Sequence, residues 1–333
     1  MPLFKPSPLV GSSSSLLAKL TVGARLHFGL LAFDSEEASF GGVGVMIDHP
    51  GLEVHASEAE HFTATGPLAD RIESFAHLWK QSTDLELPAV QMTTRGQLRD
   101  HVGLGCGTQL GLAVGTLLSK LAGFPLPDIP TLAATVDRAK RSAIGCYGFL
   151  EGGFLFETGH HDQAFPRLAY RGEIPSQWRF VLATQHELHG RHGEDEEEGF
   201  RQLDRVPEPT TARLRQLVEG EMIPGLEASD MGRFGEAVYQ YGCLAGDCYA
   251  LLQGGRYANP TCTDLVQRMR SFGITGVGQS SWGPTIFGLC EDGRQAEALC
   301  THLRERYSES QLQLEISRPN NRGVQLQWAS PNG

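Results

Sequence analysis

A glycine-rich run followed at once by a long apolar segment constrains this chain more than any other feature. Residues 103–109 read Gly-Leu-Gly-Cys-Gly-Thr-Gln, and apolar residues recur with helical spacing over residues 110–121. Alternate glycines favour backbone conformations that the interiors of helices and strands avoid, so the run predicts a loop that turns into a helix N-terminus. Backbone N–H groups converge at such an end and the helix dipole is positive there, which makes the loop an anion site, for phosphate above all.

Thr108 is expected either to cap this helix or to contact a phosphate oxygen directly. A tight turn that binds nothing is the competing interpretation of the glycines. A second glycine-rich loop near the C-terminus favours the phosphate site, because two such loops can close around one ligand.

Charge and length limit the classes of partner. The 333 residues suffice for two ordinary domains, and 28 Lys and Arg against 39 Asp and Glu give a formal net charge of −11. Such a surface repels nucleic acid and anionic membranes, and no apolar run approaches the roughly 20 residues that span a bilayer. We therefore expect no nucleic-acid or membrane partner. Residues 1–20 contain prolines and four serines, and are interpreted as a loose extension rather than a signal peptide.

Cysteine usage favours the cytoplasm. The chain has seven cysteines, an odd number, and no pair has the spacing of zinc ligands. Reduced thiols in a cytoplasmic protein are the simplest account. Cys106 lies in the glycine loop, yet nothing supplies it with an obvious base, so a small residue that fits a crowded loop is favoured over a nucleophile.

Helical and strand patterns alternate without a regular βαβ repeat, which predicts an α+β fold. A polar stretch at residues 171–177 is the expected boundary between two domains, residues 21–175 and 176–333. Helices are expected, among others, at residues 70–80, 131–140 and 233–252, and strands at residues 24–33, 41–47, 89–94, 178–183, 274–278, 285–289, 312–316 and 324–328.

Three further segments carry candidate site residues. Arg25 and His27 occupy alternate positions of the first strand and share one face, which either meets a phosphate or carboxylate or is an exposed polar edge. Residues 276–285 form a second loop of glycines and hydroxyls, including Gly278, Ser280 and Ser281, that is placed to close over a phosphate.

The basic segment 138–142, which ends in Arg141 and Ser142, either complements a helix dipole or neutralises a pyrophosphate. His160, His161 and Asp162 resemble a metal cluster, but adjacent strand residues point to opposite faces. We therefore expect no metal site at these residues, with His160 alone lining a pocket.

Residues 22–30, 103–109 and 276–282, in this order, resemble the three motifs of the GHMP kinase superfamily. The block from Arg141 to Gly145, with Phe149, residues 152–154 and residues 159–160, narrows the resemblance to the β-ribofuranosylaminobenzene 5′-phosphate synthase family. The resemblance implies an N-terminal domain with a left-handed βαβ crossover, a C-terminal ferredoxin-like domain and a ligand between them. Gly145 stands where many kinases of the superfamily place a catalytic aspartate, and Cys106 replaces a serine often present in the synthase loop.

The resemblance implies phosphoribosyl transfer from phosphoribosyl pyrophosphate to a ring carbon of 4-aminobenzoate or 4-hydroxybenzoate, with loss of carbon dioxide and pyrophosphate, in methanopterin biosynthesis. Mg²⁺ is expected with the pyrophosphate, and no organic cofactor. A homodimer is one open alternative for the assembly. An ATP-dependent small-molecule kinase and a non-catalytic ligand sensor are the alternative functions. The expected catalytic residues are Arg25, His27 and Arg141, and the expected binding residues are Gly103, Gly105, Cys106, Gly107, Thr108, Gln109, Ser142, His160, Gly278, Ser280 and Ser281.

Overall fold

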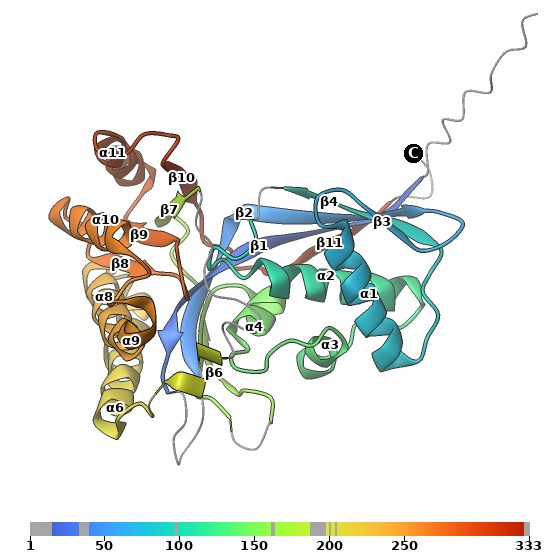
Figure 1. The fold of residues 1–333 in the computed structure, drawn as a ribbon, viewed down its shortest axis with the longest axis horizontal. Helices are drawn as coiled ribbons and strands as arrows, with labels where there is room; N and C mark the ends of the chain where they lie inside the picture. The colour runs from blue at the N-terminus through green and yellow to red at the C-terminus, as the bar shows by residue number, and fades with distance from the viewer. Residues whose placement is uncertain are drawn as a thin grey trace, which may run out of the picture.

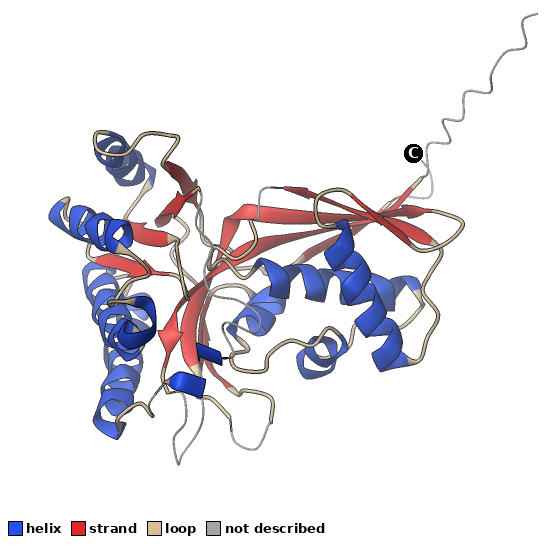
Figure 2. Cartoon of the chain, in the orientation of Figure 1, coloured by secondary structure: helices blue, strands red, loops and turns tan. Residues whose placement is uncertain are grey.

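The chain folds into two sheets, each covered by helices, as Figure 1 and Figure 2 show. The computed structural model describes residues 15–32, 40–96, 99–160, 164–186, 198–199, 201–203 and 205–329. Within these ranges the expected α+β class is confirmed, because helices and mainly antiparallel strands occur together rather than as a parallel βαβ repeat.

The first sheet has seven strands, in the order β11-β1-β2-β4-β3, with β5 paired to β2 and β6 paired to β5. β1 and β2 are long and antiparallel, whereas β3 and β4 run parallel and are connected through α1. The strands are β1 (Leu16–Leu30), β2 (Gly42–Glu58), β3 (Thr63–Thr65), β4 (Val90–Gly96), β5 (Phe154–Glu157), β6 (Leu168–Gly172) and β11 (Gln325–Trp328).

A layer of helices lies along one face of this sheet in Figure 1. They are α1 (Ala69–Thr83), α2 (Cys106–Leu121), α3 (Ile129–Thr135) and α4 (Ile144–Glu151). α2 is buried at every residue from Gln109 to Ser119, as a helix that is apolar on all sides must be. It packs against β1, β2 and the other three helices, so its N-terminus is held firmly at the end of the layer.

The start of β1 corrects the expected N-terminal extension. β1 begins at Leu16, not near residue 24, and its first residues pair with both β2 and β11. Ala18 and Leu20 are fully buried, because alternate residues of this segment face the helix layer. Residues 1–14 lie outside the described part of the chain.

The second sheet has the order β10-β7-β9-β8, and every neighbouring pair is antiparallel. In sequence order this is 4-1-3-2, the arrangement of a ferredoxin-like βαββαβ unit. Alternate residues of β7 face two cores: Val181 and Ala183 pack with α10 and α11, and Phe180 and Leu182 face the first sheet. The strands are β7 (Arg179–Gln185), β8 (Gly276–Gln279), β9 (Ile286–Cys290) and β10 (Leu312–Ser317).

The helix α8 joins the two sheets. The Tyr241 hydroxyl donates to the Gly29 carbonyl of β1 at 3.0 Å, and Phe234 packs against Phe154 of the first sheet and Trp178 beside the second. One apolar core therefore runs through both halves. The helical elements of this half are α6 (Glu208–Leu217), the π-helical turn η1 (Val218–Met222), α7 (Ile223–Glu227), α8 (Met231–Cys248), α9 (Ala250–Gln253), α10 (Pro260–Ser271) and α11 (Gly293–Arg304).

Residues 176–333, expected as one domain, are divided between the two sheets. β7 to β10 form the second sheet, but β11 returns to pair with β1 in the first. Among the helices in the described ranges, none is long and apolar enough to cross a membrane.

The prediction of a helix over residues 131–140 is wrong for the second half of that range. α3 ends at Thr135, and both Asp137 and Ala139 adopt left-handed backbone conformations, with φ of 55° and 68°. A helix cannot continue through such residues, so the basic segment 138–142 is a loop.

Candidate active site

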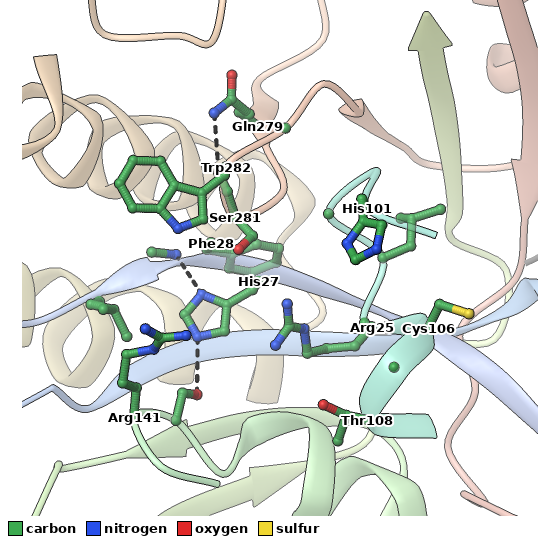
Figure 3. Close-up of a pocket in the computed structure, with 18 of the residues that line it drawn as sticks. Arg25, His27, Phe28, His101, Cys106, Thr108, Arg141, Gln279, Ser281 and Trp282 are labelled. Carbon is green, nitrogen blue, oxygen red and sulfur yellow. Dashed lines mark hydrogen bonds between the residues drawn. The ribbon is translucent and has the colours of Figure 1, made fainter. Parts of the chain in front are cut away.

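A cavity of about 430 Å³ lies where the two halves meet. Its walls are β1, the loop before α2, the loop 137–142, the region from Gly242 to Tyr257 and the loop after β8. Figure 3 shows Arg25 and Arg141 on either side of His27, with Trp282 at one end of the cavity and Thr108 and Cys106 at the other. The three segments singled out in the sequence therefore meet at one site.

The loop before α2 is shaped by its glycines. Gly105 is the N-cap of α2, has a φ of 75°, and provides no side chain to cap the first turn. Its carbonyl accepts from Thr108 N and Gln109 N, both at 3.1 Å, so the first turn forms at once. The N-terminus of α2 lines the cavity from Cys106 to Thr108, as the sequence predicts for an anion site.

Three arginines surround this helix end. A Cβ atom on Gly107 would lie 2.6 Å from Arg71 Nη2 and 3.6 Å from Arg138 Nη2, and one on Gly105 would lie 3.4 Å from Arg25 Nε. Burial and then the neighbouring Arg71 charge lower the pKa of Arg138, as expected for like charges held together. We call this region, from Gly105 to Thr108 with Arg25, Arg71 and Arg138, the anion end.

The opposite side of the cavity is aromatic. The rings of Tyr249 and Trp282 meet edge to face with centroids 4.6 Å apart, and Phe28 lines the same cavity. Phe28 is held from behind by stacking on Phe287. We call Phe28, Tyr249 and Trp282 the aromatic end.

Basic side chains outnumber acidic ones along the wall. Arg71 is ion-paired with Asp100, and Lys140 with Asp137 at 2.8 Å, which leaves a positive excess in a chain of formal charge −11. The charged lining residues are Arg25, Arg71, Arg138, Lys140, Arg141, Arg256, Asp100 and Asp137. This excess favours an anionic ligand.

His27 is neutral and hydrogen-bonds to the Ser142 side chain. Gly29 N donates to His27 Nδ1 at 3.2 Å, so the ring proton lies on Nε2, which is 3.1 Å from the Ser142 hydroxyl. Burial and then the Arg25 charge lower the pKa of His27 well below its usual value. Both nitrogens are used within the protein, so His27 positions Ser142.

Ser280 connects the motifs and does not line the cavity. It is fully buried, donates to the Gly103 carbonyl at 2.7 Å and accepts from His27 N at 3.0 Å. A Cβ atom on Gly103, where φ is +85°, would lie only 2.2 Å from the Ser280 carbonyl oxygen. Ser281 does line the cavity, next to Trp282.

Three other expected binding residues lie outside the cavity wall. Gln109 is fully buried and donates to the Gly145 carbonyl at 2.9 Å, because it sits on the inner face of α2. Gly278, in β8, packs against the ring of Phe287 in β9. His160 stacks on Phe40 with centroids 5.6 Å apart, and His161 and Asp162 lie outside the described residues.

Cys106 is not set up as a nucleophile. Burial and then the neighbouring Asp100 carboxylate raise the pKa of its thiol, which stays protonated. This agrees with the prediction of a small residue in a crowded loop.

Sequence reasoning missed Arg71, which carries no local signal because it lies on the helix α1 among other polar residues. It also missed Glu157, the last residue of β5, whose carboxyl is fully buried behind Ser142. A charged residue at the end of an apolar strand was the one available signal.

The described carboxylates do not form a protein-built metal site. In the described part of the chain, no group of three or more His, Cys, Asp or Glu side chains gathers around one point. Both aspartates of the wall are ion-paired. The expected Mg²⁺ therefore stays a prediction, and no step below depends on it.

Comparison with known proteins agrees with this geometry. The family model described as GHMP kinases C terminal matches residues 222–309, which span α8 to α11 and the strands β8 and β9 of the second sheet. A β-ribofuranosylphenol 5′-phosphate synthase from Archaeoglobus fulgidus is 27% identical over 93% of this chain and 100% of that protein. These matches confirm the resemblance to the GHMP kinases and to the synthases that the sequence motifs indicate.

The chain is a homologue of the β-ribofuranosylphenol 5′-phosphate synthases. The one from Methanothermobacter thermautotrophicus is 26% identical over 81% of this chain and 87% of that protein. The structure of a putative homoserine kinase from Listeria monocytogenes, 14% identical, superimposes with a TM-score of 0.67 over 94% of this chain and 100% of that one. The GHMP kinase fold is thus confirmed.

Proposed function

We propose that this chain transfers the phosphoribosyl group of phosphoribosyl pyrophosphate to the ring carbon of 4-hydroxybenzoate that carries the carboxylate, releasing carbon dioxide and pyrophosphate. The observation that carries the proposal is a single cavity with an anion end and an aromatic end. The homologues are named for a ribofuranosylphenol, which favours the hydroxy acid over 4-aminobenzoate as the acceptor. The pathway remains methanopterin biosynthesis, as the resemblance implies.

The anion end fits the pyrophosphate. Departure of the leaving group concentrates negative charge on its oxygens, and the N–H groups at the start of α2 with Arg25, Arg71 and Arg138 stabilise that charge. Arginine is suited to this role because its planar guanidinium donates to two oxygens at once.

The aromatic end fits the acceptor ring. Trp282 and Phe28 offer faces and edges for stacking, and Arg141 is placed to pair with a carboxylate in the same region. Holding the ring carbon beside the sugar makes a bimolecular reaction effectively unimolecular, which accounts for much of the rate enhancement.

The chemistry requires no base at the attacking carbon. As the bond from sugar carbon to pyrophosphate breaks, the electron-rich ring carbon attacks the oxocarbenium-like sugar. The bond to the carboxylate then breaks, carbon dioxide leaves, and its electron pair restores the aromatic ring. Gly145, in place of the aspartate of many kinases, fits such a reaction, and a Cβ atom there would lie 3.2 Å from Thr108 Cγ2.

The test mixes purified protein with phosphoribosyl pyrophosphate, Mg²⁺ and carboxyl-labelled 4-hydroxybenzoate, and in a parallel reaction 4-aminobenzoate. Labelled carbon dioxide and pyrophosphate released in equal amounts are the expected result. ATP consumption with a small alcohol or acid, and no release of carbon dioxide, would replace this proposal with the kinase alternative. Ligand-dependent thermal stabilisation with no product from any mixture would favour the sensor.

A further inference from the structure

A buried carboxylate is connected to the cavity through one hydroxyl. Glu157 is fully buried, and its Oε2 atom accepts from Ala143 N at 2.8 Å. Glu157 Oε1 is buried with no hydrogen-bond partner, and the nearby Ser142 hydroxyl lowers the pKa of this carboxyl. Ser142 lines the cavity, so its hydroxyl stands between Glu157 and any bound ligand.

The direction of the hydrogen bonds is set by His27. Because Nε2 of this ring carries the proton, it donates to the Ser142 oxygen at 3.1 Å. The proton of the Ser142 hydroxyl is then directed to the Glu157 carboxylate. The second lone pair of the Ser142 oxygen accepts from Ile144 N at 3.3 Å, and a proton donor in the cavity would replace this longer bond.

Among the described residues, the charged or titratable groups that interact with Glu157 from the elements around it are Arg25 on β1, Cys146 and Tyr147 on α4, and Tyr241 on α8. Burial raises the pKa of Glu157 to about 7, against the opposing effects of the hydrogen bonds from Ser142 and Ala143 and of the Arg25 charge. A group with such a pKa exchanges protons readily near neutral pH.

We infer that Glu157, acting through Ser142, accepts the proton of the acceptor's ring hydroxyl and returns it after carbon dioxide has left. The inference rests on the proposed function. The O–H bond of the ring hydroxyl breaks and an O–H bond forms on Ser142, whose own proton passes to a Glu157 oxygen. The electron pair left on the ring oxygen is delocalised to the attacking carbon. After decarboxylation the ring oxygen takes the proton back by the reverse path. Ser142 touches the substrate, and Glu157 is a positioning residue that holds the proton.

This arrangement distinguishes the two acceptors. A ring hydroxyl donates its electrons fully only after losing its proton, whereas an amino group donates a lone pair without losing one. Loss of the carboxylate therefore slows turnover of 4-hydroxybenzoate far more than turnover of 4-aminobenzoate. A general structural defect would slow both equally.

The experiment compares wild type, Glu157→Gln and Ser142→Ala, the last of which removes the relay but keeps the buried carboxylate if the amide variant fails to fold. In wild type, kcat/KM for 4-hydroxybenzoate is expected to rise with pH up to about 7, because the carboxyl must be ionised to accept a proton. The variants are expected to lose about 100-fold at neutral pH and to recover at alkaline pH, where the substrate ionises unaided. Equal losses with both acceptors, or an unchanged pH profile, would overturn the inference.

A second measurement separates this inference from the proposed function. Ultraviolet difference spectra of 4-hydroxybenzoate, bound at neutral pH in the presence of pyrophosphate, report whether the ring hydroxyl is ionised. A phenolate band in wild type that is lost in Glu157→Gln supports the relay even if no ribosyl transfer occurs. Transfer without such a band, and with no loss in either variant, would leave the proposed function intact and the relay disproved.

Discussion

The anion end and the aromatic end share one cavity but depend on the chain in different ways. At the anion end, backbone N–H groups and left-handed glycines set the geometry, and arginines from β1, α1 and the loop 137–142 add charge. At the aromatic end, side chains from β1, the end of α8 and the loop after β8 form the wall. We therefore expect binding at the anion end to be weakened by backbone changes and by loss of charge. Binding at the aromatic end should be weakened by the loss of individual rings.

The largest expected effect is at Gly103, where the backbone of one loop meets the backbone of another. Gly103→Ala places a Cβ atom 2.2 Å from the Ser280 carbonyl oxygen at a positive φ, so unfolding free energy falls by about 3 kcal/mol or more. Chemical denaturation measures the loss. The control is Gly123→Ala, with the same φ of +85° but no atom within 4 Å, which should cost only about 1 kcal/mol. Equal losses in both variants would show that the contact with Ser280 does not matter.

Loss of charge at the anion end is expected to be next in size. Arg25→Ala should lower kcat roughly 100- to 1000-fold, because one group that stabilises the leaving pyrophosphate is removed. Steady-state assays measure this change. Arg25→Lys should recover part of the activity, since it keeps the positive charge but loses the planar guanidinium that donates to two oxygens at once. Arg294→Ala, exposed on α11 and away from the cavity, serves as the control. Normal activity of Arg25→Ala would remove this residue from the scheme.

At the aromatic end the effect should be smaller and confined to one substrate. Trp282→Leu is expected to raise KM for the benzoate about tenfold while KM for phosphoribosyl pyrophosphate changes little, because ring stacking is lost. Trp282→Phe should keep most of the affinity. Trp328→Leu, on the half-exposed last strand, is the matched control. Equal rises in both KM values would mean that the two ends do not act separately.

The smallest effect is expected for the Cys106 thiol at the anion end. Cys106→Ser should leave kcat/KM within about threefold of wild type, because a thiol that stays protonated is not the nucleophile. Activity assays before and after thiol alkylation provide the check. Complete loss of activity in a folded Cys106→Ser protein would contradict the view that this end acts through its backbone and arginines.

The anion end was predictable from the sequence to the extent that its signals are local. The glycine run predicts both the loop and the start of α2, and the alternation of Arg25 and His27 predicts a shared face. Arg71 and Glu157 reach the site only through the packing of α1 and β5, which no local pattern encodes.

The errors have the same origin. Ser280 and Gln109 belong to the expected loops, yet tertiary contacts turn both side chains into the protein and use them to hold Gly103 and Gly145. The N-terminal extension was predicted to run to residue 20, whereas β1 begins at Leu16. The burial of Ala18 and Leu20 depends on β2 and β11, which are far away in sequence.

The pairing of β1 with β11 has a consequence for synthesis. β1 is the first described strand to leave the ribosome, and β11, the last, covers one of its edges. Until β11 is made, that edge offers unpaired N–H and C=O groups to any other extended chain. During most of translation the nascent protein therefore has an unpaired β1 edge that other chains could bind. The first sheet is completed only after all strands of the second sheet have been synthesised.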